Sequence, residues 1–114
     1  MRMWNVNPKI MCRQHLLGEH LEMHMFAGTI IKGKNIDGYI QTGLVEVGNI
    51  KRRHDELVKE MKARGFNHKS PLADFEGTIS AGNVNVEENM KELRNRCKEC
   101  GMLQINVRRI KDGK

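Results

Sequence analysis

A long helical run near the amino terminus constrains the fold of this chain more than any other feature. Asn7 is a good N-cap residue, and Pro8 suits the first helical position because the N–H that it lacks would be unpaired there. The pattern continues to about Phe26 and is rich in leucine and methionine over most of its surface. A helix with so little polar surface is largely buried, so the sequence predicts a mainly α-helical protein.

Two further helices are predicted from caps and periodicity. Asn49 caps a helix over residues 50–64, and Gly65 fits the left-handed position that ends many helices. Asn85 begins a third helix, with Glu88 placed for a capping box. The core stripe of this third helix consists of Val86, Met90, Leu93, Cys97 and Cys100.

The remaining segments are predicted to connect these helices. We expect residues 1–6 to be extended, residues 27–48 and 70–84 to form loops or short elements, and the basic tail from Leu103 to alternate briefly like a strand. The sequence therefore predicts a compact single-domain three-helix core with irregular loops and an extended amino-terminal segment. Residues 1–114 form this one domain.

Composition indicates a small folded domain with a polyanionic partner. Aromatic residues make up only 4% of the 114 residues, so the core must rest on aliphatic side chains and eight methionines. The net charge of +6 favours a nucleic acid, because neutralised phosphates release counterions. Arg53 is a candidate DNA contact on the basic surface of the second helix, although solvated charges are the commoner explanation of such a surface.

Cysteine usage and hydropathy bear on the location of the protein. Three cysteines, an odd number, argue against a disulfide framework and for a reducing cytosol. No apolar run approaches the ~18 residues of a membrane span, and the amino terminus lacks the pattern of a signal peptide. We therefore expect a cytoplasmic protein without a membrane partner.

The first helix carries a polar stripe on its otherwise apolar surface. His15, Glu19 and Glu22 share one helical face, and Gly18 lies beside them. Because the rest of the helix is apolar, this stripe is predicted to line a cleft. The alternative is a satisfied polar network at a helix edge, which is the commoner role of buried polar groups.

The amino terminus is a second candidate reactive group. Arg2 is too large for the usual removal of an initiator methionine, so Met1 is expected to supply the α-amine. An unperturbed α-amine has a pKa of ~7.7–8, against ~10.4 for lysine, so a useful fraction is neutral and nucleophilic near neutral pH. The helix rises ~21 Å from Pro8 to Glu22, and six extended residues span at most ~20 Å, so this amine can reach Glu22.

A family resemblance rests on two segments, MRMWNVNPKIMCRQHLLGEHLEM and KRRHDELVKEMKARGFNHK. Both resemble parts of the phage endonuclease V type of pyrimidine dimer DNA glycosylase, and the resemblance covers about the first 70 residues. A Gln-His pair, a Glu seven residues after the His, and an Arg-Gly-Phe-Asn helix end recur in order. The resemblance implies a protein of the bacterial or phage-infected host cytoplasm.

The resemblance further implies a DNA repair glycosylase with AP lyase activity, which acts on a damaged or modified base in double-stranded DNA without a metal or another cofactor. By position, Met1 would be the nucleophile that forms a Schiff base at C1′. Glu22 would be the carboxylate that assists ring opening and β-elimination. Four residues are expected to contact DNA: Arg2, Gln14, His15 and His20. The last of these stands where the family often has an aromatic residue.

Departures from the family pattern motivate an alternative function. Leu21 and Met25 replace family arginines, and the aromatic, basic carboxy-terminal segment of the family is missing. These departures favour a lesion other than a thymine dimer. They also allow a non-catalytic binder of nucleic acid, or of a small phosphorylated ligand, on the same scaffold.

Zinc is a further alternative. Cys97 and Cys100 form half of a zinc site, which Cys12 and a histidine could complete, and a small zinc-stabilised interaction protein is the corresponding function. His20 and His24 share a helical face but do not match the spacing of a zinc protease. We expect core or DNA-facing roles for these histidines and no metal site.

Overall fold

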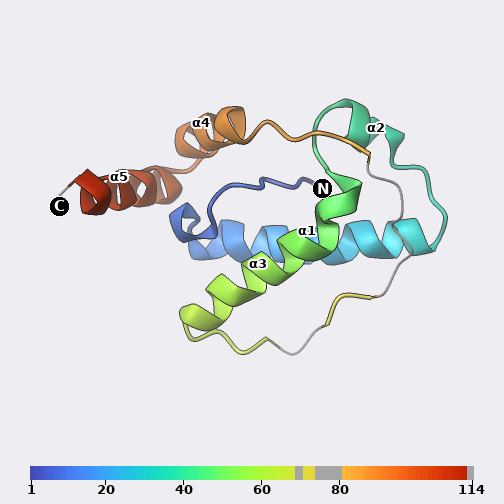
Figure 1. The fold of residues 1–114 in the computed structure, drawn as a ribbon, viewed down its shortest axis with the longest axis horizontal. Helices are drawn as coiled ribbons and strands as arrows, with labels where there is room; N and C mark the ends of the chain where they lie inside the picture. The colour runs from blue at the N-terminus through green and yellow to red at the C-terminus, as the bar shows by residue number, and fades with distance from the viewer. Residues whose placement is uncertain (69–70, 74–80, 113–114) are drawn as a thin grey trace.

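The computed structural model describes residues 1–68, 71–73 and 81–112, and the protein is mainly helical, as the sequence predicts (Figure 1). In chain order the elements are η1 (Pro8–Ile10), α1 (Arg13–Ile31), α2 (Asp37–Gln41), η2 (Val47–Asn49), α3 (Ile50–Ala63), α4 (Val86–Arg96) and α5 (Lys98–Asp112). The two η elements are short 3-10 helices. Residues 70 and 74–80 of the predicted connector lie outside the described residues.

The first α-helix begins later than predicted. The Asn7 side chain accepts a hydrogen bond from the N–H of Lys9, as an N-cap does, but it caps only η1. Met11 is extended, with φ −96° and ψ 135°, which ends η1. Cys12 then caps α1, because its sulfur accepts the N–H of His15. The interruption reverses the chain between the amino-terminal segment and α1 (Figure 1).

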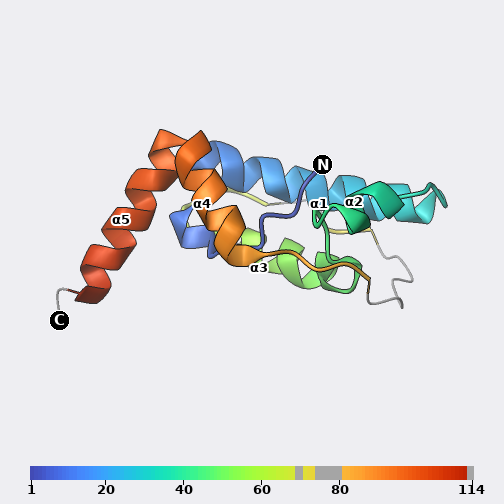
Figure 2. The same ribbon diagram turned by 90° about the horizontal axis from the view of Figure 1, so that it is seen from above.

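The second predicted helix is confirmed as α3. It ends at the left-handed turn expected of Gly65, which has φ +87°, and the N–H of Phe66 then donates to the carbonyl of Met61. Asn49 stands at the N-cap position, but its side chain makes no capping hydrogen bond and donates to Glu46 instead. α3 packs across α1, and this is the most extensive contact between two elements (Figures 1 and 2).

The third predicted helix is divided in two. Asn85 caps α4 as predicted, by accepting the N–H of Glu88. Cys97 is extended, with φ −129° and ψ 113°, so α4 ends there and α5 starts with the next residue. Val86, which the periodicity placed in the core, is 36% exposed because it lies on the first turn of α4.

The prediction of a strand-like tail is wrong. α5 continues to Asp112, so the alternation that starts at Leu103 belongs to a helix. The physical reason is that Cys100, Leu103 and Val107 also recur at helical spacing, and a short run of alternating residues is compatible with both periods.

The amino-terminal segment is extended, as predicted, and lies along α1 with its end near the middle of that helix (Figures 1 and 2). Met3, Trp4 and Val6 are buried. The N–H of Met3 donates to the carbonyl of Leu44 at 2.7 Å, and Asn89 of α4 donates its amide to the carbonyl of Trp4 at 2.8 Å. The segment is therefore fixed on both sides.

The core of aliphatic and methionine side chains includes residues from every long helix. Met3, Leu16, Leu57, Leu93 and Cys100 are fully buried within it. α4 and α5 thus pack on the same core as α1 and α3. In the part of the chain that the structure describes, no helix has both the length and the apolar character needed to cross a membrane.

Candidate active site

A pocket of about 230 Å³ lies where the amino-terminal segment, α1 and α4 meet. It is lined by four residues that the sequence assigns to the site: Arg2, Gln14, His15 and Glu22. Glu19 and Gly18, which belong to the predicted polar stripe of α1, also line it, together with two residues that the sequence does not assign to the site, Trp4 and Arg96. The polar stripe of α1 therefore lines a pocket, as its position on an apolar helix predicts.

Glu22 lines this pocket and lies within electrostatic reach of the amino terminus. The α-ammonium of Met1 acts on the Glu22 carboxylate as a neighbouring positive charge, since the amino-terminal segment runs back along α1 (Figure 2). Burial raises the pKa of Glu22, and the α-ammonium and the backbone N–H of Arg2 offset this only in part. A half-buried carboxylate with a raised pKa beside an amine is suited to proton transfer.

Arg2 is held on the wall of the pocket. Its Nη2 donates to Asn89 Oδ1 at 2.6 Å and to Glu92 Oε2 at 2.8 Å. Its guanidinium carbon lies 3.9 Å from the centre of the Trp4 ring. The Nε atom of Arg2 is buried without a hydrogen-bond partner among the described residues.

Trp4 and Arg96 extend the site beyond what the sequence assigns. Trp4 packs edge-on against His15, with 6.1 Å between ring centres, and the Arg96 guanidinium lies 5.5 Å from the Trp4 ring. Trp4 is the single tryptophan of the chain and lies three residues after the candidate nucleophile, so its position in the sequence could have indicated a place in the site. Arg96 gives no such signal, because it lies outside the core stripe that the sequence predicts for its helix.

Arg53 does not lie where the sequence analysis expected it. Its side chain is fully buried and pairs with the equally buried Glu19 through two contacts, Nε to Oε2 at 2.6 Å and Nη2 to Oε1 at 2.7 Å. It also donates to the carbonyl of Val6 and to Glu56, each at 2.6 Å. A guanidinium with no solvent exposure is not accessible to a DNA phosphate. The burial of Arg53 therefore argues against the expected DNA contact.

The same contacts keep Arg53 charged inside the core. Burial alone would lower the pKa of Arg53, but the hydrogen bonds and negative charges of Glu19 and Glu56 outweigh it and raise the pKa. Arg53 therefore joins α3 to α1 and to the amino-terminal segment, and it fixes the chain a few residues from Met1.

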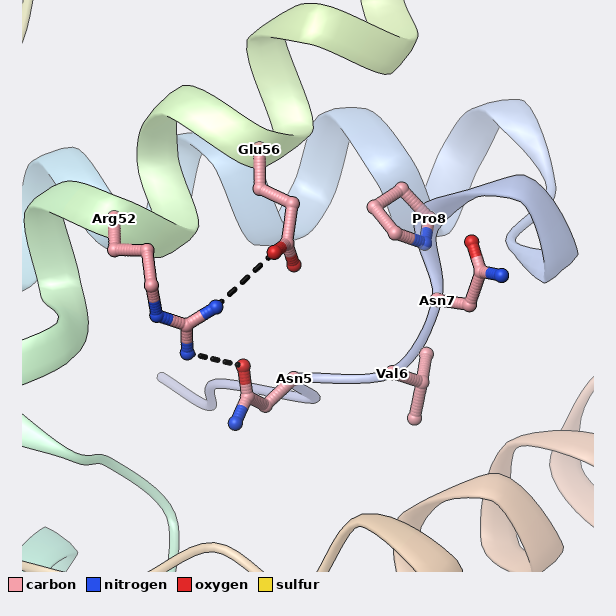
Figure 3. A pocket seen from close by; sticks show the side chains of 6 residues that line it. All are labelled: Asn5, Val6, Asn7, Pro8, Arg52 and Glu56. Atoms are coloured by element: carbon pink, nitrogen blue, oxygen red, sulfur yellow. Dashed lines mark hydrogen bonds and ion pairs between the residues drawn. The ribbon is translucent and has the colours of Figure 1, made fainter.

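Asn5 sets the direction of the amino-terminal segment. Its backbone is left-handed, with φ +56°, a conformation that asparagine tolerates better than most residues. Its side chain accepts from Arg52 at 3.1 Å, and Arg52 pairs with Glu56 at 3.0 Å across a second pocket of about 460 Å³ (Figure 3). Because Arg52 and Glu56 already pair with each other, we assign the residues of this second pocket a structural role in holding the amino-terminal segment.

Replacing Asn5 is expected to loosen the amino-terminal segment. Asn5→Ala should lower the free energy of unfolding by about 1–2 kcal/mol, because alanine pays the cost of a left-handed backbone. Asn5→Gly is the matched control, since it keeps that backbone conformation and loses only side-chain hydrogen bonds, so it should cost less. Urea denaturation measures both, and equal stability of the two variants would contradict the role given to the backbone.

His20 faces other histidines rather than the pocket. It lies with His24 of the same helix, His54 of α3 and His68 in a group of four imidazoles. Burial and the three neighbouring rings lower the pKa of His20 to about 4. The ring is therefore neutral near pH 7 and offers no positive charge to a phosphate.

One comparison with known proteins bears on this site. The family model described as pyrimidine dimer DNA glycosylase matches residues 1–74. The chain belongs to the pyrimidine dimer DNA glycosylase family. No curated protein and no solved structure matches the chain.

Membership of the pyrimidine dimer DNA glycosylase family supports a DNA repair enzyme that acts on DNA with damaged bases. The matched residues include the amino-terminal segment, α1 and α3. They do not include α4, which supplies Arg96 and the partners of Arg2 to the pocket. Residues inside and outside the family match thus build one site.

Proposed function

We propose that the protein is a DNA glycosylase with AP lyase activity that uses the α-amine of Met1 as its nucleophile. The amine nitrogen attacks C1′ of a damaged or modified nucleotide, and the bond from C1′ to the base breaks. Opening of the sugar ring leaves an imine between Met1 and C1′. Glu22 then takes a proton from C2′, the bond from C3′ to its oxygen breaks, and the 3′-phosphate leaves.

The observation that carries this proposal is the half-buried Glu22 at the pocket, on which the α-ammonium of Met1 acts as a neighbouring charge. Imine formation needs a neutral amine, and elimination needs a base within reach of C2′. The raised pKa of Glu22 makes it a stronger base than an exposed carboxylate. No metal is required at any of these steps.

The other pocket residues fit a nucleotide drawn out of a duplex. An enzyme that acts at C1′ must extrude the nucleotide, which exposes a gap in the base stack. Arg2, Gln14 and Arg96 offer donors to phosphates and base edges at the pocket, and the net charge of +6 favours binding of DNA. We propose double-stranded DNA with a damaged or modified base as the substrate.

Borohydride trapping tests this function directly. The untagged protein is incubated with duplex DNA that holds one abasic site, and sodium borohydride is added to reduce any imine. A covalent protein–DNA adduct is expected, and peptide mapping should place it on Met1. A protein that binds the DNA but gives no adduct would contradict the lyase and support a non-catalytic binder. The exposure of Leu21 and Met25, 60% and 47%, favours that alternative because no cation stands there.

The pH dependence of strand cleavage should report Glu22. The carboxylate acts as a base only when it is ionised, so the rate falls as the pH drops through the pKa of Glu22. Because burial raises this pKa, the fall is expected above the usual range of a carboxyl group. Single-turnover cleavage between about pH 4 and pH 8 measures it. Glu22→Gln should remove the contribution of this carboxylate to the fall, and an unchanged pH profile in that variant would contradict the assignment.

A further inference from the structure

Three sulfur atoms and one imidazole nitrogen converge at the start of α1. They belong to Cys12, His15, Cys97 and Cys100, and all four atoms lie within 4.8 Å of one another. Cys12 and His15 come from the first turn of α1, and Cys97 and Cys100 come from the junction of α4 and α5. The sequence therefore supplies the ligands as two pairs, Cys-x-x-His and Cys-x-x-Cys, from opposite ends of the described chain.

The distances among these atoms are those of a tetrahedral zinc site. With Zn–S of ~2.3 Å and Zn–N of ~2.0–2.1 Å, two sulfur ligands stand ~3.8 Å apart, and a sulfur and a nitrogen stand ~3.6 Å apart. The Cys12 and Cys97 sulfurs are separated by 3.8 Å. The Nδ1 atom of His15 lies 3.2 Å from the Cys12 sulfur and 3.7 Å from the Cys100 sulfur.

Backbone groups around the cluster suit negatively charged sulfur. The N–H of Cys12 donates to the Cys100 sulfur at 3.2 Å, and the N–H of Cys100 donates to the Cys97 sulfur at 3.5 Å. Such hydrogen bonds orient and stabilise metal-bound thiolates. Three thiolates and one zinc ion leave a net charge of −1. The adjacent surface pocket that includes Cys12 is lined by three basic residues, Arg13, Arg64 and Lys98, and one acidic residue, Glu99.

A disulfide accounts for the cluster less well. All three cysteines are free, and a sulfur separation of 3.8 Å is far beyond the ~2.05 Å of a disulfide bond. A disulfide would also leave the third sulfur and the His15 nitrogen without a reason to converge. Core packing alone predicts apolar neighbours around each thiol rather than four ligand atoms within 4.8 Å of one another.

We propose that Cys12, His15, Cys97 and Cys100 bind one structural zinc ion. The ion joins the first turn of α1 to the α4–α5 junction, and α4 carries Arg96 to the pocket. His15 binds through Nδ1, so its ring is fixed between the zinc site and Trp4. The zinc therefore attaches the carboxy-terminal helices, which lie outside the family match, to the proposed active site.

Metal analysis with cobalt substitution tests this site. The untagged full-length chain is purified under reducing conditions, and its zinc is measured and then replaced by Co²⁺. Intense thiolate-to-cobalt absorption is expected, together with X-ray absorption that shows about three sulfurs and one nitrogen at a metal–sulfur distance of ~2.3 Å. Cys97→Ser/Cys100→Ser should lose this absorption, and Glu87→Gln, an exposed change on α4, is the control that keeps it.

The wild-type measurement decides the proposal even where the cysteine variant fails to fold. Zinc without sulfur ligands, absence of the thiolate-to-cobalt absorption, or a Cys12–Cys97 disulfide in protein kept under reducing conditions would each overturn it. None of these measurements depends on glycosylase activity, so the zinc site and the proposed function fail or hold separately.

A second cluster carries an independent inference. The Nε2 atoms of His20, His24, His54 and His68 lie within 4.8 Å of one another, and three of their separations are 3.3, 3.2 and 3.0 Å. Four nitrogens around a tetrahedral zinc ion stand ~3.3–3.4 Å apart, given Zn–N of ~2.0–2.1 Å. The cluster joins α1, α3 and the segment that follows α3.

Hydrogen bonds between the rings do not satisfy this cluster. A ring nitrogen carries either one in-plane hydrogen or one lone pair. The Nε2 atom of His20 nevertheless faces both His24 and His68, and the Nε2 atom of His24 faces both His20 and His54. Atoms that meet in this way point to a shared central ion.

The carboxylate of Asp55 provides the outer contact that metal-binding histidines usually have. It lies 3.0 Å from Nδ1 of His54, so Nδ1 carries the hydrogen and Nε2 keeps its lone pair for a metal. We infer that the four histidines bind a second zinc ion, which joins α1 to α3 away from the pocket residues.

Metal stoichiometry tests the histidine site. The wild-type chain is expected to bind two equivalents of Co²⁺, and His24→Asn one, with the thiolate-to-cobalt absorption of the first site unchanged. That absorption also reports that the variant is folded around the cysteine site. A wild-type stoichiometry of one, or a His24→Asn variant that still binds two equivalents, would overturn the inference.

Discussion

Adding a few residues before Met1 is expected to abolish the borohydride-trapped adduct and to slow cleavage at an abasic site on the order of 100-fold or more. The extension turns the α-amine into an amide, which cannot form an imine. The pocket offers no substitute, because the described residues that line it include no lysine. Trapping yield and single-turnover cleavage of abasic duplex DNA measure the effect.

The matched control places the same extension after Lys114. It leaves the amine free, and the adduct should form as in the untagged protein. A trapped adduct of equal yield with the extended amino terminus would show that another amine is the nucleophile, and the assignment of Met1 would be wrong.

Glu22→Gln separates the two steps that the mechanism assigns to Met1 and Glu22. At an abasic site the sugar already equilibrates with its open aldehyde form, so the imine can form without Glu22 opening the ring, and trapping should persist in this variant. Elimination needs a base, so strand cleavage should fall by about 10²–10⁴-fold. Glu87→Gln, an exposed change on α4, is the control and should leave both steps unchanged. Loss of trapping in Glu22→Gln without loss of folding would contradict this division of roles.

The sequence predicted much of the site because local rules position its residues. Helical periodicity places His15, Glu19 and Glu22 on one face, and chain reach allows Met1 to approach Glu22. Both inferences need only the geometry of one helix and one extended segment. In the structure, His15, Glu19 and Glu22 line one pocket, and the α-ammonium of Met1 acts on the Glu22 carboxylate.

Features that depend on tertiary contacts could not be predicted in the same way. Arg53 shares its helix with many exposed cations, and only the buried Glu19 of another helix makes its core position favourable. The sequence places Cys97 in the core stripe of a continuous helix. In the structure the helix ends at Cys97, and the sulfur of this cysteine contacts that of Cys12, which lies near the other end of the chain. Periodicity identifies a face, but it does not identify the partner of that face.

Removal of the Arg53 guanidinium should lower the free energy of unfolding far more than removal of an exposed charge. Arg53→Met is expected to lower the free energy of unfolding by about 3–5 kcal/mol, because it leaves the buried Glu19 carboxylate without its partner. The carbonyl of Val6 also loses a donor, so the amino-terminal segment should loosen as well. Urea denaturation followed by circular dichroism measures the stability.

The neighbouring Arg52 provides the matched control. Its side chain is about half exposed and pairs with a partly exposed Glu56, so Arg52→Met should cost less than about 1 kcal/mol. Glu19→Met/Arg53→Met removes both buried charges, and this double variant should be more stable than Arg53→Met because no unpaired charge remains. If Arg53→Met were as stable as Arg52→Met, the buried ion pair would not hold the amino-terminal segment against α1 and α3. The amino-terminal segment carries the proposed nucleophile, so borohydride trapping should be weaker in Arg53→Met. If the double variant regains stability but still traps less DNA than the wild type, the ion pair positions Met1 as well as stabilising the core.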